Sequence, residues 1–376
     1  MMTPAGGAEE CVIMGADRID EIVRLVNKKR VGLIVNQTSI LSNGTHLLDT
    51  LLKENIQVVK VFAPEHGFRG SEEAGAAVHN DRDSKTGISI ISVYGNNNKP
   101  AASQLADVDL LIFDIQDVGT RFYTYISTMH YIMEASAEND IEFIVLDRPN
   151  PNDYVDGPVR QKGFSSFVGV DPIPQLHGLT VGELACMING EGWIATGKNS
   201  CRLQVVPMIN WLHGDPYLLP VKPSPNLPNN RAIRLYPSLC LFEGTSISVG
   251  RGTTFPFQAL GNPDDRYGTF TFTPKPIRGM DSNPMHNGRV CYGIDLRDND
   301  FDEGLTLRYV LDFYRKSGYN EKEFFKFSNR FDLLAGTDAL RLQIINGYSE
   351  EEIRNSWQAE LNEYKIMRNK YLLYDE

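Results

Sequence analysis

Polar and titratable residues follow directly after an apolar run in residues 58–70, VVKVFAPEHGFRG. Pro64 ends the strand propensity of this run, because proline donates no hydrogen bond to a sheet. Glu65 and His66 come next, and open α/β sheets bind their ligands outside the carboxyl ends of the strands. The alternative is a solvated turn with incidental charge. The same arrangement recurs further along the chain, and this favours a ligand site.

Other predicted strands also end in polar side chains, which would gather at one rim of a sheet. A rim dense in carboxylates, arginines and amides can hold a polyhydroxylated ligand and transfer protons. Aromatic side chains near the rim in sequence would stack on the apolar faces of a sugar. The polar set is Asn36, Glu65, His66, Asp114, Gln116, Asp117, Arg121, Asp147, Arg148 and Asn150, and the aromatic set is Phe68, Tyr94, Tyr123 and Tyr125.

Glu65 is the predicted general acid of this rim. It lies between a proline and a histidine, directly after a buried strand. Burial raises the pKa of a carboxyl group and so keeps it protonated for proton donation. Asp114 and Asp117 are either catalytic or caps of the following helix. His66 is either catalytic or an orienting hydrogen-bond partner. For Asp147 beside Arg148, a structural ion pair is the simpler explanation.

Strands and helices must alternate along the chain to build such a rim. Apolar runs that each end in polar residues are separated by helical patterns, and this order predicts a mostly parallel sheet with right-handed crossovers. The runs are apolar throughout, as expected of strands covered on both faces. The predicted strands are 31–35, 58–62, 88–93, 109–113 and 141–146, with a further strand at 203–206, and the predicted helices include 18–29, 46–54, 122–139 and 180–189.

A Pro-rich stretch at 219–237 separates this half from a turn-rich and helical remainder. The fold class is therefore α/β, with a sheet domain flanked by helices over residues 11–230 and a smaller α+β domain over residues 231–376. In the second domain a strand is predicted at 289–296. Helices are predicted at 305–316, 320–325, 337–346 and 349–368.

Composition excludes several classes of protein. The chain of 376 residues has a formal net charge of −11, whereas a nucleic-acid groove needs a basic face. The five cysteines are scattered, and none forms a CxxC pair, which argues against a zinc site and a disulfide framework. We expect no metal and no organic cofactor. No apolar run reaches the roughly 18 residues of a membrane span, and nothing in the sequence indicates an oligomeric state.

The motifs that contain these residues resemble those of a known family, the bacterial exo-β-N-acetylmuramidases, formerly classed as a domain of unknown function. The similar motifs are Asn36-Gln37-Thr38, residues 62–70 (FAPEHGFRG) and residues 113–125 (FDIQDVGTRFYTY). Further similar motifs lie at residues 146–151, 156–158, 177–183, 223–226, 242–245 and 250–253. The resemblance extends from about Val31 to the C-terminus.

The resemblance implies a hydrolase that removes N-acetylmuramic acid from the non-reducing end of peptidoglycan fragments. It implies a Rossmann-like domain, a smaller C-terminal domain and an active site in the cleft between them, with the catalytic glutamate at Glu65. It also implies a periplasmic or extracellular protein. Residues 1–10 contain no signal-peptide core, so the expectation is that a signal peptide has been removed.

The partners implied by this resemblance are peptidoglycan-derived muramyl saccharides, whose lactyl carboxylate needs a cation. Guanidinium groups bind carboxylates bidentately, and the candidates are Arg69, Arg121, Arg148 and Arg251. A second carboxylate would activate water or stabilise the oxocarbenium-like transition state, and the candidates are Asp114, Asp117 and Glu243. The acetamido group of the substrate is an alternative to that carboxylate. The remaining predicted sugar contacts are Asn36, Tyr123, Tyr125, Asn150 and Glu243.

Two other classes of function remain as alternatives. A non-catalytic periplasmic protein that binds sugars or peptidoglycan would also have two α/β lobes around a cleft. A nucleotide-dependent enzyme is disfavoured, because no GxGxxG motif follows the first predicted strand. A chromogenic muramic-acid glycoside separates the hydrolase from the binding protein, since a binding protein releases no chromophore.

Overall fold

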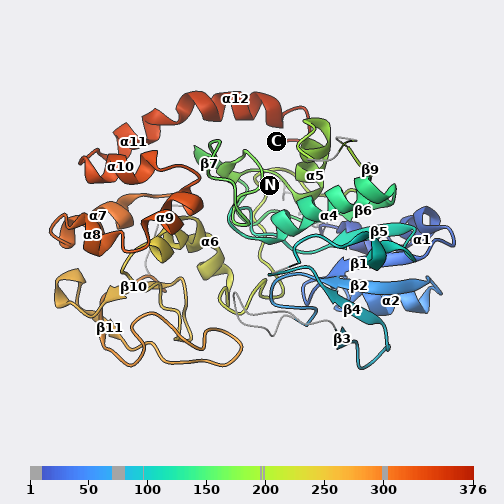
Figure 1. Ribbon diagram of the computed structural model, residues 1–376, viewed down its shortest axis with the longest axis horizontal. Helices are drawn as coiled ribbons and strands as arrows, with labels where there is room; N and C mark the ends of the chain where they lie inside the picture. Colours follow the sequence, from blue (N-terminus) through green and yellow to red (C-terminus); the bar gives the residue numbers. More distant parts are fainter. Residues whose placement is uncertain (1–10, 70–80, 96, 195–196, 198–199, 299–303) are drawn as a thin grey trace, which may run out of the picture.

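The computed structural model describes residues 11–69, 81–95, 97–194, 197, 200–298 and 304–376. Its N-terminal part is built on a seven-stranded sheet in the order β3-β4-β2-β1-β5-β6-β9 (Figure 1). All neighbouring strands are parallel except β3, which pairs antiparallel with β4 at one edge. The bounds are β1 Val31–Val35, β2 Val58–Ala63, β3 Asp81–Arg82, β4 Ser89–Ser92, β5 Leu110–Asp114, β6 Glu142–Leu146 and β9 Arg202–Val206.

The sheet is covered on both faces, and the side chains of β1 show how. Leu33 belongs to a core that also contains residues of α1 and α2. Ile34 belongs to the larger core, together with residues of α4 and α5. Successive strand residues point to opposite faces, so a strand between two cores is apolar throughout. The predicted mostly parallel, Rossmann-like sheet is confirmed. The helices are α1 Ile19–Val26, α2 Leu47–Lys53, α3 Ala102–Leu105, α4 Tyr125–Asn139 and α5 Val181–Gly190.

The C-terminal part is smaller and combines an antiparallel sheet with helices, as predicted. The sheet has the order β10-β12-β11. A separate pair of antiparallel strands, β7 and β8, lies in sequence between β6 and α5, within the N-terminal part. The strands are β7 Val155–Val159, β8 Pro174–His177, β10 Ala259–Asn262, β11 Phe270–Phe272 and β12 Cys291–Asp295. The helices are α6 Asn230–Leu239, α7 Arg308–Lys316, α8 Glu321–Phe324, α9 Ser328–Ala335, α10 Ala339–Ile345, α11 Glu350–Ser356 and α12 Gln358–Arg368.

The Pro-rich stretch ends in a helix that the sequence did not predict. α6 is capped by Asn229, whose side chain accepts from the backbone N–H of Ala232 at 2.9 Å, and it contains Pro237. A proline inside a helix leaves the carbonyl four residues earlier without its helical donor. That carbonyl belongs to Ile233, and it accepts a hydrogen bond from Asn152 Nδ2 at 3.1 Å. The side chain of Asn152 therefore allows this helix to continue through its proline. The predicted boundary between residues 230 and 231 stays a prediction.

One long predicted helix, 349–368, is two helices in the structure. α11 and α12 meet at Trp357, whose φ of −103° ends the first helix. The predicted capping box of Ser349 and Glu352 is present at the start of α11. The larger core is continuous from the sheet, where it contains Phe113, to the C-terminal helices, where it contains Phe313. The two parts therefore share buried apolar surface.

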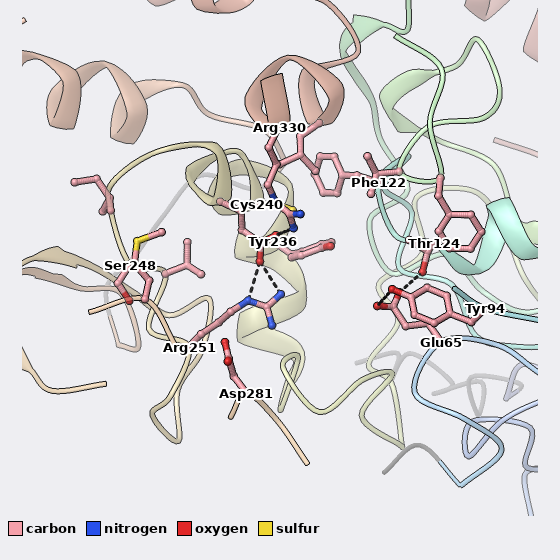
Figure 2. A pocket seen from close by; sticks show the side chains of 17 residues that line it. Glu65, Tyr94, Phe122, Thr124, Tyr236, Cys240, Ser248, Arg251, Asp281 and Arg330 are labelled. Atoms are coloured by element: carbon pink, nitrogen blue, oxygen red, sulfur yellow. Dashed lines mark hydrogen bonds and ion pairs between the residues drawn. The ribbon is translucent and has the colours of Figure 1, made fainter. Parts of the chain in front are cut away.

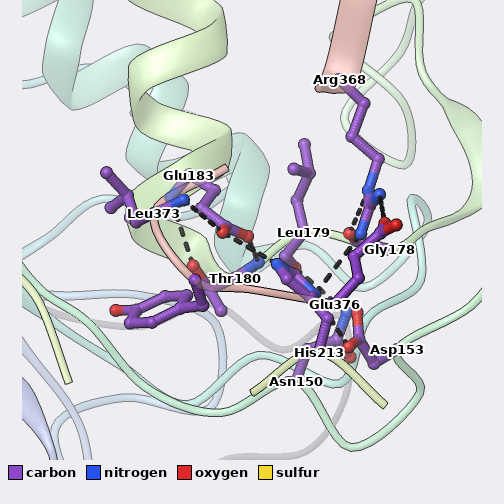
Figure 3. Close-up of polar contacts among 12 residues, drawn as sticks. Asn150, Asp153, Gly178, Leu179, Thr180, Glu183, His213, Arg368, Leu373 and Glu376 are labelled. Atoms are coloured by element: carbon purple, nitrogen blue, oxygen red, sulfur yellow. Dashed lines mark hydrogen bonds and ion pairs between the residues drawn. The ribbon is translucent and has the colours of Figure 1, made fainter. Parts of the chain in front are cut away.

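The end of the chain returns to the N-terminal part. After α12, which arches over the top of the molecule in Figure 1, the Tyr374 hydroxyl donates to Asp147 Oδ2 at 2.6 Å, just beyond β6. The backbone N–H of Leu373 donates to Glu183 Oε1 of α5 at 2.8 Å. Arg368 Nε donates to the carbonyl of Gly178 at 2.6 Å (Figure 3). These contacts fasten the C-terminal helices to the sheet domain.

His213 lies at the centre of this contact. Its ring nitrogens lie 2.9 Å from Asp153 Oδ2 and 2.9 Å from Glu183 Oε1 (Figure 3). Burial opposes the charged imidazolium, but the two carboxylates outweigh it and raise the pKa of His213 to about 9. Burial, together with Glu183, raises the pKa of Asp147 to about 6. Among the described residues, no helix is long and apolar enough to cross a bilayer.

Candidate active site

A cavity of about 510 Å³ lies between the two parts of the chain. In Figure 2, Glu65, Tyr94 and Thr124 form one side, and Arg251 and Asp281 lie opposite. The predicted cleft between the domains is therefore present. The lining residues are Glu65, Tyr94, Phe122, Thr124, Phe167, Val168, Tyr236, Cys240, Glu243, Ile247, Ser248, Val249, Arg251, Asp281, Met285, Arg330 and Leu334.

Glu65 reaches the cavity from a tight turn at the end of β2. The backbone N–H of Gly67 donates to the carbonyl of Pro64 at 2.9 Å and closes the turn. His66, the third residue of this turn, has a φ of 68° and a buried side chain. A left-handed backbone is unfavourable for a residue other than glycine, and such conformations cluster at functional sites. The turn directs Glu65 toward the cavity and His66 toward the interior.

Two hydroxyl groups hold the carboxyl group of Glu65. The Tyr94 hydroxyl donates to Oε1 at 2.8 Å, and Thr124 Oγ1 donates to Oε2 at 2.5 Å. Tyr94 follows β4, and Thr124 is the residue before α4. Three segments that are far apart in sequence therefore meet at one carboxyl group, and the rigid helix start and strand ends fix its orientation.

Glu243 faces the cavity from the opposite side, in the 3₁₀ turn Cys240–Gly244. Its Oε1 accepts from Arg251 Nε at 2.7 Å, and its Oε2 accepts from Arg330 Nη2. Burial opposes ionisation of this side chain, but the two guanidinium groups outweigh it and lower the pKa of Glu243 to about 2. Glu243 is thus a fixed anion, and it orients two arginines at the edge of the cavity.

Asp114 and Arg148, two of the predicted site residues, lie outside the cavity lining and pair with each other. Arg148 Nε and Nη2 bind the two carboxylate oxygens of Asp114 at 2.6 and 3.0 Å. Both side chains are almost fully buried. Arg148 therefore forms a structural ion pair, but its partner is Asp114 rather than the neighbouring Asp147. This geometry gives Asp114 a structural role and leaves Arg148 without access to a substrate.

Arg121 also lies outside the cavity lining, contrary to its predicted place among the substrate-binding cations. Its exposed fraction is 1%, and its Nη1 donates to the carbonyls of Pro158 and Ile173, both at 2.8 Å. Nη2 donates to the carbonyl of Leu334 at 2.9 Å. Burial, together with Arg160, lowers the pKa of Arg121 to about 9. Arg121 links the β7–β8 hairpin to α9, the helix that carries Arg330.

The remaining predicted site residues also lie outside the cavity lining. Arg69 pairs with Asp83 at 2.5 Å and lies over Phe68. Asp117 Oδ2 accepts from the N–H of Gly119 at 2.7 Å and lies 3.6 Å from His177 Nε2. Asn36 Oδ1 accepts from the N–H of Thr38 at 2.8 Å, and Asn150 Nδ2 donates to the carbonyl of Leu179 at 3.0 Å. The Tyr125 hydroxyl donates to the carbonyl of Pro223 at 3.2 Å, and the rings of Tyr123 and Tyr125 lie 4.9 Å apart between centroids.

Sequence reasoning did not single out Thr124, Arg330 or Asp281. Thr124 lies within the motif of residues 113–125, so its position next to α4 offered a signal. Arg330 lies on α9, which has no side-chain cap and was not predicted. Asp281 lies in a loop bridged to Ile277. Among the described residues, no group of three or more His, Cys, Asp or Glu side chains is arranged to hold a metal ion.

A hydroxyl group can donate or accept a hydrogen bond, so it can bind a carboxyl group that is either protonated or ionised. A carboxyl group held by hydroxyls therefore suits proton donation to a glycosidic oxygen. Fixed cations on the other side of the cavity suit a sugar that carries an acid. These features are the ones expected of an α/β glycosidase whose site lies between two parts of the chain.

Comparison with known proteins identifies the family. The chain belongs to the exo-β-N-acetylmuramidase NamZ family, whose N-terminal and C-terminal profiles match residues 31–231 and 234–374. It is 40% identical over 365 residues to the peptidoglycan β-N-acetylmuramidase NamZ of Bacillus subtilis, and the match covers 92% of this chain and 87% of that protein. The family resemblance seen in the motifs is confirmed.

Solved structures agree with this assignment. A DUF1343 family protein from Bacteroides fragilis superimposes with a TM-score of 0.89 at 43% identity, covering 98% of this chain and 100% of the other. A second DUF1343 family protein from the same organism superimposes with a TM-score of 0.84 at 30% identity, covering 97% of this chain and 99% of the other. The family fold therefore extends over nearly the whole chain.

Proposed function

We propose that the chain hydrolyses the β-glycosidic bond of N-acetylmuramic acid at the non-reducing end of peptidoglycan fragments. The observation that carries this proposal is the position of Glu65, which enters the cavity from a strained turn and accepts hydrogen bonds from Tyr94 and Thr124. In this mechanism Glu65 donates its proton to the leaving-group oxygen as the glycosidic bond breaks.

The second chemical role belongs to the acetamido group of the substrate. Both carboxylate oxygens of Glu243 are held by arginines, so Glu243 is poorly placed to take a proton from water. Asp281 lies beside Arg251, across the cavity from Glu65 (Figure 2). A neighbouring acetamido oxygen can attack the anomeric carbon as the leaving group departs. Water then opens the resulting oxazolinium ion at the anomeric carbon, and the Glu65 carboxylate takes the proton of this water and so recovers its acid form. A trifluoroacetamido substrate should therefore react more slowly than the natural substrate, whereas equal rates would favour Asp281 for this role instead.

The lactyl carboxylate of the muramyl sugar binds Arg251 and Arg330 in this proposal. A guanidinium group has five N–H donors, so each arginine can hold Glu243 and still donate to a substrate. The side chain of Arg330 is 56% exposed and that of Arg251 is 22% exposed, which leaves donors accessible from the cavity. Peptidoglycan lies outside the cytoplasmic membrane, so we also propose a periplasmic or extracellular location, which fractionation of the producing cell would test.

The decisive experiment uses a disaccharide with N-acetylmuramic acid at its non-reducing end. The purified protein should release free N-acetylmuramic acid, identified by mass spectrometry, and the Glu65→Gln variant should release almost none. Activity should persist in EDTA. A protein that binds the disaccharide but leaves it intact would be a binding protein, and the proposal would then be wrong.

A further inference from the structure

Three aromatic rings continue from Glu65, and two of them, Tyr94 and Phe167, line the cavity. The Tyr94 ring, whose hydroxyl binds Glu65, has its centroid 5.6 Å from that of Phe167. Phe167 in turn stacks on Tyr131, with centroids 6.2 Å apart and planes 5° from parallel. All three side chains are half-buried. We call Tyr94, Tyr131 and Phe167 the aromatic shelf.

The position of Phe167 is fixed by the loop that carries it, between β7 and β8. Ser166 and Gly169 exchange backbone hydrogen bonds of 3.2 and 3.0 Å on either side of Phe167. At the end of this loop, Asp171 Oδ1 lies 2.9 Å from His130 Nδ1 of α4. Both side chains are nearly fully buried. The same helix begins directly after Thr124, which binds Glu65. One rigid element therefore sets both the carboxyl group and the aromatic shelf.

We propose that the aromatic shelf is the subsite for the sugar on the leaving-group side of the bond, and that Phe167 is its main contact. This inference rests on the proposed function, because it takes Glu65 as the proton donor. The ligand class is a β-linked pyranose, whose axial C–H groups pack on an aromatic face. Phe167 is then a specificity-determining residue, and His130 and Asp171 are positioning residues.

The direction of the substrate follows from the charges. The cations Arg251 and Arg330 lie across the cavity from Glu65, so the acid-bearing sugar occupies the space between them and the proton donor. The glycosidic oxygen must lie within hydrogen-bond reach of Glu65. The sugar on the other side of that oxygen therefore lies away from the arginines and next to Tyr94 and Phe167. The uncharged rings of these two residues suit a sugar without an acid group.

The test compares two substrates that differ only in the leaving group. One is the muramyl disaccharide, and the other is the methyl β-glycoside of N-acetylmuramic acid, whose leaving group has no ring. Phe167→Ala should lower kcat/KM about tenfold on the disaccharide and should lower kcat/KM on the methyl glycoside much less. Phe167→Trp should retain activity on the disaccharide. Tyr348→Ala, which removes a ring that is 46% exposed elsewhere, should change neither value.

Each outcome decides the proposal. Equal losses on the two substrates would mean that Phe167 supports the fold or the muramyl sugar, and unchanged activity on both would mean that the shelf is unused. Either result overturns the inference and leaves the proposed function intact. If the wild-type protein hydrolyses neither substrate, the inference and the proposed function are both wrong. If the Ala variant does not fold, Phe167→Leu keeps apolar volume without an aromatic face and should show the same selective loss.

Discussion

Glu65 and Glu243 line the same cavity, yet the described side chains that bind them differ in kind. Glu65 accepts from the neutral hydroxyls of Tyr94 and Thr124. Glu243 accepts from two guanidinium groups, which lower its pKa to about 2. A hydroxyl can either donate or accept, whereas a guanidinium can only donate. If Glu65 carries a proton, the Tyr94 or Thr124 hydroxyl can rotate and accept it in a hydrogen bond. If Glu243 carried a proton, the N–H groups of its two arginines could not accept it, and donor would face donor.

The difference shows how one residue type serves two purposes within one cavity. The partners of a carboxyl group, rather than its location in the cavity, decide whether it can release and regain a proton. In the proposed mechanism, Glu65 changes its charge during the reaction. Glu243 keeps its charge and so keeps two arginines in place for an anionic substrate.

The largest expected effect is that of Glu65→Gln. Glutamine preserves the shape of the side chain and its hydrogen bonds but cannot donate a proton as a carboxylic acid does. We expect kcat on the natural disaccharide to fall by about 10²- to 10⁴-fold, with folding and substrate affinity largely retained. A nitrophenyl glycoside, whose leaving group needs less protonation, should lose less. If the Gln variant keeps near-wild-type kcat on the disaccharide, Glu65 is a structural residue and its contrast with Glu243 does not hold.

Arg330→Ala should have the next largest effect. Glu243 would keep Arg251, which binds it at 2.6–2.7 Å, so the cavity wall should persist while one cation is lost. Because hydrogen bonds to charged groups are stronger than neutral ones, we expect KM for muramyl substrates to rise on the order of 10- to 100-fold. N-acetylglucosaminyl analogues, which lack the lactyl carboxylate, should be affected less. Equal losses on both sugars would contradict a role in anion recognition.

Acid pH should weaken the Glu243 cluster in the folded protein. The pKa of Glu243 is lowered from 4.5 to about 2, so its contribution to the free energy of unfolding is present above pH 4.5 and is lost as the pH falls toward about 2. The loss should be at most about 3 kcal/mol. Urea unfolding of the wild type and of Glu243→Gln across this range would show it, since the variant should lack this part of the pH dependence. Parallel curves for the two proteins would refute the assignment.

Alkaline pH should act elsewhere, through His213, with the smallest effect on activity. Because the pKa of His213 is raised from 6.5 to about 9, its stabilising charge is present below pH 6.5 and is lost as the pH rises through about 9. We expect the melting temperature of the wild type to fall over this range more steeply than that of His213→Gln. The value of kcat at neutral pH should be similar for both proteins, because His213 lies outside the cavity lining. A large loss of kcat in the variant would contradict this prediction, because it would show that His213 affects the cavity that contains Glu243.

The central sheet could be predicted because strands covered on both faces are unbroken apolar runs, as β1 and β5 are. The strands β10 and β11 could not, because they have only 4 and 3 residues and little apolar pattern. The helix through Pro237 could not be predicted either, since it depends on Asn152, a residue far away in sequence. Local sequence patterns carry no information about such distant partners.

The same limit applied to the site. Glu65, Glu243 and Arg251 were predicted and line the cavity, because motifs placed them next to strand ends and turns. Arg121 was predicted to bind substrate, but a sequence does not show that backbone carbonyls will surround a guanidinium. Arg330 was missed because its helix is joined to Glu243 only in three dimensions. Charge type could be predicted from the sequence, whereas charge pairing required the fold.

The contact of Tyr374 with Asp147 also constrains how the protein is made. Asp147 follows β6 in the middle of the sheet domain and accepts a hydrogen bond from a residue near the end of the chain. Domains generally begin to fold from the N-terminal side during synthesis, but the tyrosine that completes this set of hydrogen bonds follows Asp147 by 227 residues. The nascent sheet domain therefore holds Asp147 first through Thr180 and Gly182, and the Tyr374 hydroxyl can join them only after the C-terminal helices have been made.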